Sequence, residues 1–114
     1  MNDFKSIQPI KMLQPGRKIT GMSAILLPMA SPDLIDWEGF DAHVVRTFDA
    51  GLTPAINMDT GYGHLLDAST RLETLERTRA IAQGRDFLAG AFVGDNPGDN
   101  FDPDAYRSDI DQIQ

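Results

Sequence analysis

The segment Asn57-Met58-Asp59-Thr60-Gly61-Tyr62 has the residue types best suited to chemistry. Thr60 offers a hydroxyl and the glycine-bearing turn offers backbone N–H groups. Such donors can hold a carboxylate through charge-assisted hydrogen bonds. Asp59 could relay a proton, or pair with a substrate amine or hydroxyl. The same residues would also suit an ordinary turn in which Asp and Thr bond to the backbone.

Other common motifs are incomplete. Gly61-Tyr62-Gly63 begins like a dinucleotide fingerprint, but Leu66 stands where the third glycine belongs. The Asp-rich stretch 95–100 lacks the turn glycine and the closing glutamate of a calcium loop. The two histidines, His43 and His64, have no second ligand at metal spacing. We therefore predict no metal site and no bound cofactor.

Periodicity predicts the elements that must position this segment. Short apolar runs bounded by proline or glycine are typical of parallel strands buried on both faces, and spaced apolar residues indicate amphipathic helices. The predicted strands are Ser23–Met29, Pro54–Met58 and Phe87–Phe92, and the predicted helices lie near 36–50, 69–83 and 102–114. This β-α-β-α-β-α order predicts an α/β fold with adjacent parallel strands. In such folds sites form at the carboxyl ends of strands, where Asp59 and Thr60 lie.

Helix boundaries and faces can also be predicted. Residues 31–36 have turn composition, with Asp36 as a cap for the first helix. A capping box is predicted at Thr70-Arg71-Leu72-Glu73, and Pro103 occupies the favoured first position of the third helix. The apolar stripes are predicted to be Trp37, Phe40, Val44 and Phe48; then Leu72, Leu75, Arg79 and Ala82; then Tyr106, Ile110 and Ile113.

Composition bounds the function classes. The chain has 114 residues, a formal net charge of −7 and no cysteine. The acidic balance disfavours nucleic-acid and anionic-membrane partners, which attract Lys and Arg. No apolar stretch is long enough to span a bilayer. The lack of cysteine suits a cytoplasmic location. Residues 1–20 are predicted to be an N-terminal extension, and residues 21–114 the folded domain.

The chain resembles the dihydrodipicolinate synthase/N-acetylneuraminate lyase family over roughly residues 19–114. Ala24-Ile25-Leu26-Leu27-Pro28-Met29 resembles the opening strand and its Thr-Pro-Phe-like end. Asp59-Thr60-Gly61-Tyr62 occupies the place of the Thr-Thr-Gly-Glu motif, and Phe87-Leu88-Ala89-Gly90 is similar to the Val-Ile-Ala-Gly strand. The resemblance implies the first three βα units of a (β/α)8 TIM barrel, which takes about 250 residues in full.

The resemblance also implies roles for individual residues. Thr60 matches the threonine that grips the substrate carboxylate, and Gly61 matches the glycine that makes the turn. Asp59 replaces the first threonine, a member of the proton relay, and Tyr62 replaces the glutamate. Leu27 replaces the threonine of Thr-Pro-Phe. The Schiff-base lysine belongs to a later strand and is absent, since the chain's lysines are Lys5, Lys11 and Lys18.

The expected function is therefore that of a Schiff-base-forming aldolase or lyase acting on 2-oxo acids, here incomplete. Its partner would be a small carboxylate, a 2-oxo acid or sugar acid, and the full-length enzyme would be a homo-oligomer. This chain alone is expected to be inactive and only marginally folded. Two alternatives remain: a non-catalytic truncated product, and a barrel or open α/β protein that binds a sugar or sugar acid through Asp59 and Thr60.

Overall fold

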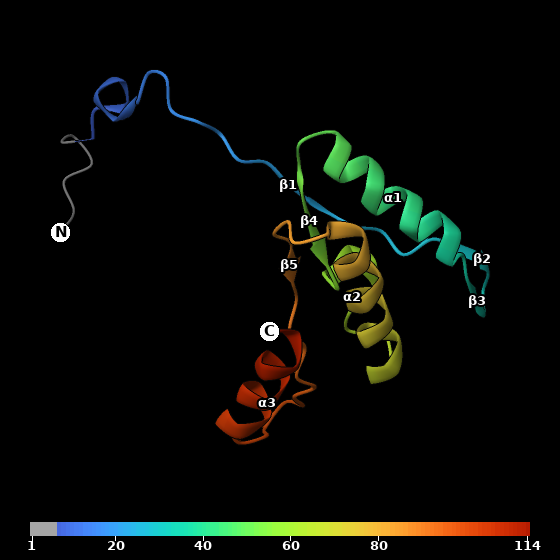
Figure 1. Ribbon diagram of the computed structural model, residues 1–114. Helices are drawn as coiled ribbons and strands as arrows, with labels where there is room; N and C mark the ends of the chain where they lie inside the picture. Colours follow the sequence, from blue (N-terminus) through green and yellow to red (C-terminus); the bar gives the residue numbers. More distant parts are fainter. Residues whose placement is uncertain (1–6) are drawn as a thin grey trace.

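The computed structural model describes residues 7–114. It is a mixed α/β chain in which every main strand is followed by a helix (Figure 1). In chain order the elements are the short 3₁₀ helix η2 (Pro9–Met12), β1 (Met22–Ala24), β2 (Met29–Ser31), β3 (Leu34–Ile35), α1 (Trp37–Asp49), β4 (Thr53–Ile56), the 3₁₀ helix η3 (Asp59–Gly61), α2 (Ala68–Ala82), β5 (Leu88–Ala89) and α3 (Pro103–Ile113).

The main sheet is parallel, with strand order β1-β4-β5. Ala24 of β1 pairs with Ala55 of β4, and Ala55 in turn pairs with Leu88 of β5. The prediction of an α/β fold with three adjacent parallel strands is therefore confirmed. The strands are shorter than predicted, because β4 ends where Asn57 adopts a left-handed backbone with φ 60°.

A second, two-stranded sheet replaces the turn that was predicted at residues 31–36. β2 and β3 pair antiparallel, Met29 with Ile35 and Ser31 with Leu34. Pro32 and Asp33 make the connecting turn, a position that suits the fixed φ of proline. The turn prediction was thus right only for the tip, and the flanking residues form a hairpin that projects beside the start of α1 (Figure 1).

Side-chain caps fix where the helices begin. The backbone N–H of Gly39 donates to Asp36 Oδ1 at 2.9 Å, so the predicted cap of α1 is confirmed. The predicted capping box of α2 is wrong. The actual N-cap is Asp67, whose carboxylate accepts from the N–H of Thr70 at 2.8 Å. Hydrogen bonds from Thr70 and Ser69 lower the pKa of Asp67.

The buried face of α2 matches the predicted stripe in part. Leu75 and Ala82 are buried as predicted, but Leu72 is 49% exposed, and Thr74 and Thr78 are buried as well. Each threonine hydroxyl donates to a backbone carbonyl or a nearby side chain; Thr78, for example, donates to Thr74 O at 2.7 Å. Burial of these polar groups is tolerated because their hydrogen bonds are satisfied locally. A search for apolar periodicity alone therefore misses this face.

The third helix begins as predicted, but its predicted inner face is largely open. Pro103 lies in the first turn of α3, and the Asp102 side chain caps the N–H groups of Asp104 and Ala105. Tyr106 and Ile110 remain 36% and 43% exposed, since no neighbouring element covers them. Only the end of this face, at Ile113, packs against the core.

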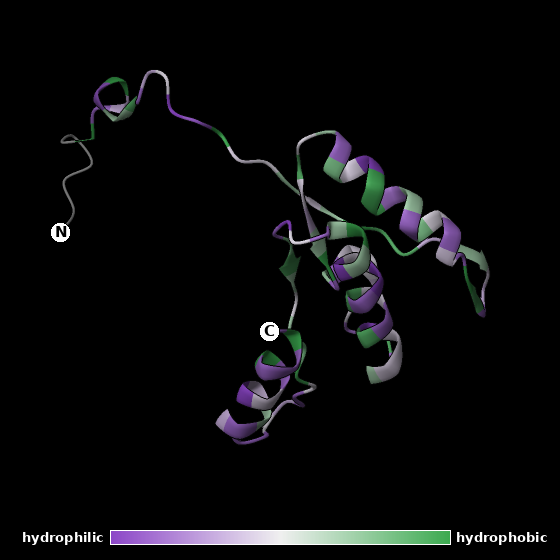
Figure 2. Cartoon of the chain, viewed as in Figure 1, coloured by the Kyte–Doolittle hydropathy of each residue, from purple (hydrophilic) through white to green (hydrophobic). Residues whose placement is uncertain are grey.

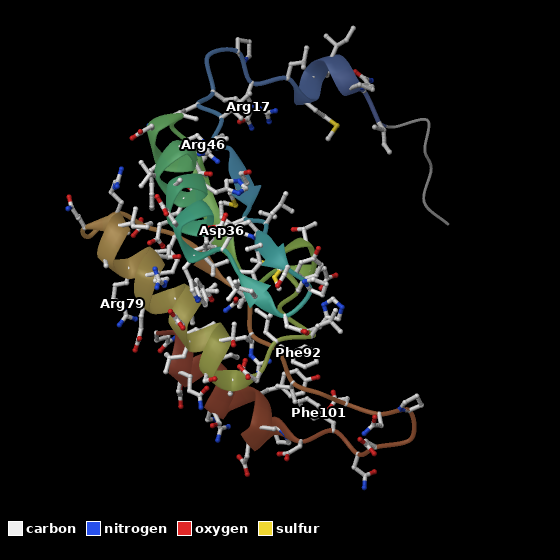
Figure 3. The ribbon with its side chains drawn as sticks, turned by 90° about the vertical axis from the view of Figure 1, so that its right-hand side faces the viewer. Arg17, Asp36, Arg46, Arg79, Phe92 and Phe101 are labelled. Carbon is white, nitrogen blue, oxygen red and sulfur yellow. The ribbon has the colours of Figure 1, made fainter. Side chains whose placement is uncertain are left out.

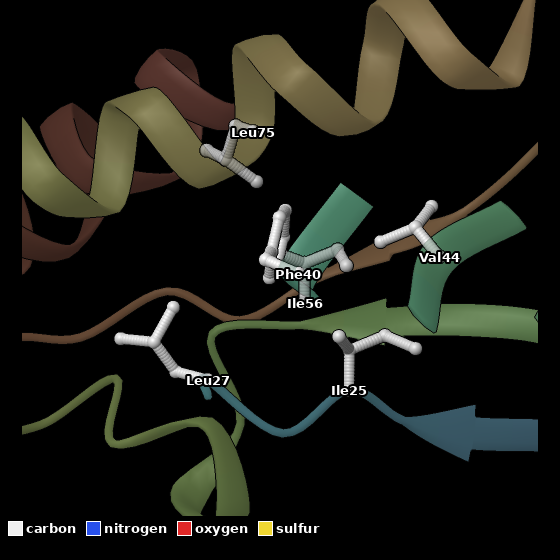
Figure 4. Packing of buried hydrophobic residues seen from close by; sticks show 6 residues of the cluster. All are labelled: Ile25, Leu27, Phe40, Val44, Ile56 and Leu75. Carbon is white, nitrogen blue, oxygen red and sulfur yellow. The ribbon is translucent and has the colours of Figure 1, made fainter. Parts of the chain in front are cut away.

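The core is a small cluster between one face of the main sheet and the first two helices. Figure 4 shows its six members: Ile25 and Leu27 follow β1, Phe40 and Val44 come from α1, Ile56 from β4 and Leu75 from α2. The predicted stripe of α1 is confirmed, because Trp37 and Phe48 pack at the edges of this cluster. The Trp37 and Phe40 rings meet edge to face, with centroids 5.8 Å apart.

The opposite face of the main sheet is exposed along its two edge strands. Met22, Leu26 and Leu88 are 59%, 53% and 39% exposed, whereas Pro54, Ala55 and Ile56 of the central strand β4 are all buried. The Cα radius of gyration is 18.4 Å, against about 13 Å for a compact domain of this length. The open sheet and the N-terminal arm (residues 7–20), which runs away from it, account for the difference (Figure 1).

The cap of α1 gives a direct test of this fold. Substitution Asp36→Ala leaves the Gly39 N–H without its acceptor and should lower the free energy of unfolding by about 1 kcal/mol. Asp36→Asn keeps a side-chain oxygen at the same place and should cost much less. Urea unfolding followed by circular dichroism measures both variants. Equal losses for Ala and Asn would contradict the capping role.

Candidate functional site

The segment singled out from the sequence lies at the carboxyl end of β4. η3 carries Asp59 and Thr60, and both side chains are exposed. They line a shallow hollow of about 380 Å³, which we name the strand-end hollow. Its other walls are residues that follow the neighbouring strands, together with the last residue of β1: Ala24, Asn57, Met58, Gly90 and Ala91. The strand ends thus meet at one edge, as the parallel sheet requires.

Asn57 anchors this edge to α2. Its Nδ2 donates to the carbonyl of Arg71 at 3.2 Å, and its Oδ1 lies 2.8 Å from the Thr74 hydroxyl. Asparagine adopts left-handed backbone more readily than most residues. This explains why the chain can turn sharply at Asn57 and still hold the helix. The side chain of Asn57 therefore has a structural role in the site.

Gly61 and Gly63 are required by close approach of the backbone. A Cβ on Gly61 would stand 2.7 Å from the carbonyl oxygen of Ile25, and a Cβ on Gly63 would stand 2.2 Å from that of Asn57. The prediction that Gly61 supplies the turn conformation needs correction. Tyr62 is the left-handed residue, with φ 60°, and Gly61 is buried against the carbonyl of Ile25.

Arg71 binds two carbonyls of the loop between η3 and α2, a role that the sequence patterns did not reveal. Its guanidinium donates to the carbonyl of Leu66 and, at 3.4 Å, to that of Gly63. The same group lies 5.5 Å from the centre of the Phe92 ring. Arginine has five donors in a planar fork, so one side chain can bridge several carbonyls. The only sequence signal was an Arg in the first turn of a helix that follows a polar loop.

Three hydrogen-bond donors of Asp59 and Thr60 are not used within the described part of the chain. Among the described residues, no acceptor is bonded to the Thr60 hydroxyl or to the backbone N–H groups of Asp59 and Thr60. The Asp59 carboxylate is fully exposed, and its Oδ1 lies 3.9 Å from His64 Nδ1. The site therefore combines unpaired donors with one acceptor that faces water.

Tyr62 lies apart from the other predicted site residues. It is 45% exposed and lines a different, larger depression between the β2–β3 hairpin and the loop before α2. The structure thus brings Asp59 and Thr60 together at the strand-end hollow, places Gly61 against the carbonyl of Ile25, and turns Tyr62 away. The left-handed backbone at Tyr62 causes this division.

The remaining candidates lie elsewhere. Lys11 and Lys18 are on the N-terminal arm, remote from the hollow, and Lys5 lies outside the described residues. His43 is half-buried in the middle of α1. Over residues 7–114, no cluster of three His, Cys, Asp or Glu side chains is placed to hold a metal ion. No helix of that range is long and apolar enough to cross a bilayer.

No family model, curated protein or solved structure matches this sequence. The structure defines a mixed α/β chain with a parallel three-stranded sheet and with α1 and α2 packed on one face of it.

The close contact at Gly61 can be tested by substitution. In Gly61→Ala the new Cβ meets the carbonyl of Ile25, so the loop must shift, and we expect a loss of about 1–3 kcal/mol in the free energy of unfolding. Gly94→Ala is the matched control, because its Cβ would meet only the Phe92 ring at 3.8 Å. Urea titration with amide chemical shifts measures both effects. A Gly61→Ala variant as stable as the control would contradict the close packing.

Proposed function

We propose that this chain forms the first three βα units of a (β/α)8 barrel similar to the dihydrodipicolinate synthase/N-acetylneuraminate lyase family. The proposed activity is aldol-type cleavage or condensation of a 2-oxo acid through a Schiff base. Support comes from the chain-order sequence of parallel strands, β1-β4-β5, each followed by a helix. The face of the sheet that is exposed along its two edge strands is what closure by further strands would cover.

The observation that carries the proposal is the set of free donors at the strand-end hollow. The Thr60 hydroxyl and the N–H groups of Asp59 and Thr60 lie at the carboxyl edge of the sheet. There they would bind a substrate carboxylate. The Asp59 side chain would repel that carboxylate at close range, so we assign it to a substrate hydroxyl or to proton transfer at the opposite side of the ligand. Tyr62 has no part in this assignment.

A desolvated lysine supplies the Schiff base in such chemistry, because burial lowers its pKa and frees the amine. We propose that it comes from outside this sequence, since Lys11 and Lys18 are exposed on the N-terminal arm. No cofactor or metal is part of the proposal. It includes a cytoplasmic location, in keeping with the cysteine-free composition.

Recognition of a sugar acid is the second candidate function. It is favoured by the Asp59 carboxylate, which stands exposed beside the donors of Thr60. A carboxylate acceptor pairs well with sugar hydroxyls, whereas a small 2-oxo acid offers it none. Comparison of pyruvate with gluconate, a sugar acid that has no 2-oxo group, separates the two candidates in one binding assay.

Thr60 provides the direct test of carboxylate binding. Thr60→Val keeps the side-chain shape and removes one donor, and a hydrogen bond to a charged group is worth about 1.5–3 kcal/mol. We therefore expect carboxylate affinity to fall by about 10- to 150-fold. Two-dimensional NMR titration of residues 1–114 with pyruvate and with N-acetylneuraminate measures it. Thr60→Ser is the control. An unchanged carboxylate affinity in Thr60→Val would contradict the binding role and indicate that Thr60 only stabilises the turn.

Covalent chemistry gives a separate expectation. Treatment of the chain with pyruvate and borohydride should leave its mass unchanged, because Lys11 and Lys18 lie on the N-terminal arm and not at the strand-end hollow. Intact-mass spectrometry followed by peptide mapping measures this. A trapped adduct at Lys5, Lys11 or Lys18 would overturn the assignment of the nucleophile to a residue outside this sequence.

A further inference from the structure

The N-terminal arm is exposed at every residue from 7 to 20 and extends away from the sheet and helices described above (Figure 1). η2 buries no residue, and Ile10, Met12 and Leu13 are 83%, 69% and 69% exposed. Figure 1 shows the arm leaving the sheet at the amino end of β1, and Figure 2 shows hydrophobic residues along it. Apolar side chains gathered on such a segment mark an interaction surface.

The arm and the rest of the chain carry opposite charge. Residues 7–20 hold Lys11, Arg17 and Lys18 and no acidic residue. Residues 21–114 hold 16 acidic and 6 basic residues, a net charge of −10. Figure 3 shows Arg17 on the arm, at the opposite end of the molecule from Phe101. The arm is therefore electrostatically complementary to the surface of its own kind of chain.

A receptor surface of matching character lies beside the β2–β3 hairpin. The depression that contains Tyr62, which we name the hairpin groove, has a volume of about 640 Å³. Its floor is apolar, with Met29, Ile35, Leu65 and Leu66, and its lining includes Asp33 and Asp67 but no lysine or arginine. Leu65 is 72% exposed. An apolar floor with acidic sides suits a ligand that is both apolar and cationic.

We propose that the hairpin groove binds the N-terminal arm of a second copy of this chain. Ile10, Met12 and Leu13 would cover the apolar floor, and Lys11 would face the carboxylates of the groove. The groove follows the carboxyl end of β1, whereas the arm leaves from the amino end and points away (Figure 1). A partner chain therefore receives the arm more readily than the same chain does. Two such contacts related by a two-fold axis close a dimer.

This inference is independent of the proposed function, because the strand-end hollow and the hairpin groove share no lining residue. A failure to bind carboxylates would therefore leave the dimer intact, and a failure to dimerise would leave carboxylate binding intact.

Disulfide capture tests the contact directly, since the chain has no cysteine of its own. Met12→Cys and Leu65→Cys are prepared separately and mixed in equal amounts under mild oxidation. The control partner is Val45→Cys on α1, which is also exposed, at 42%. All three positions are exposed, so the substitutions leave the core intact. We expect the Met12–Leu65 heterodimer to exceed the Met12–Val45 heterodimer by about tenfold or more. Equal yields would overturn the proposal.

Sedimentation equilibrium of the native chain gives the second measurement. A concentration-dependent dimer should weaken by about tenfold or more in Leu13→Asp, where a charge replaces an apolar anchor. Gln14→Asp makes the same charge change at a polar position of the arm and should weaken it less. Salt at about 1 M should weaken the native dimer in part, because it screens the charges and leaves the apolar contact. A native chain that stays monomeric, or equal effects of the two arm variants, would overturn the proposal.

Discussion

The structure depends on the contacts of Asn57, which follows β4 and touches both the next loop and α2. Two glycines lie close to the carbonyl oxygen of Asn57. A Cβ on Gly63, in the following loop, would lie 2.2 Å from this oxygen, and a Cβ on Gly90, after β5, would lie 2.6 Å from it. The side chain of Asn57 bonds to Arg71 and Thr74 of α2. One left-handed residue therefore sets the end of β4, the position of α2 and the spacing of β5. The strand-end hollow is built from the same contacts.

Contacts between α1 and α2 hold α2 in the position from which it reaches Asn57. Arg77 pairs with Asp41 across the two helices at 2.9 Å and with Glu73 on its own helix at 3.0 Å, and its guanidinium lies 4.7 Å from the centre of the Trp37 ring. Hydrogen bonding to Glu73, with help from Asp41, raises the pKa of Arg77. The second oxygen of Asp41 is buried without a partner. Because α2 is fixed to α1 here, Thr74 stays opposite Asn57.

The sequence was sufficient for the order and direction of the main elements, because apolar runs mark the strands and spaced apolar residues mark the helices. It also located Asp59 and Thr60 at a strand end, from the position of the polar loop alone. It was insufficient for the burial of the edge strands, which were predicted to be buried on both faces, whereas Leu26 and Leu88 are exposed. It was insufficient at Tyr62 and Gly61, where the roles follow from a left-handed backbone and from a carbonyl of Ile25 that is distant in sequence. It was insufficient too for α2, since buried threonines with satisfied hydroxyls look polar in any hydropathy pattern. Neither barrel closure nor Schiff-base chemistry follows from the three parallel strands, so both belong to the proposed function.

Many of the contacts that shape the strand-end hollow are local. The hydrogen bonds made by Asn57 and Arg71, and the approach of Gly63 to Asn57, lie within a single βα unit, between residues 57 and 74. The approach of Gly61 to Ile25, that of Gly90 to Asn57 and the contact of Arg71 with the Phe92 ring involve the neighbouring strands. Local contacts form at low cost in chain entropy, so the loop can reach its geometry independently of the exposed face of the sheet. The exposed side chains of Met22, Leu26 and Leu88 affect the stability of the three-stranded sheet, and not the geometry of the loop. Ligand geometry at the hollow and stability of the sheet are therefore governed by different parts of the chain.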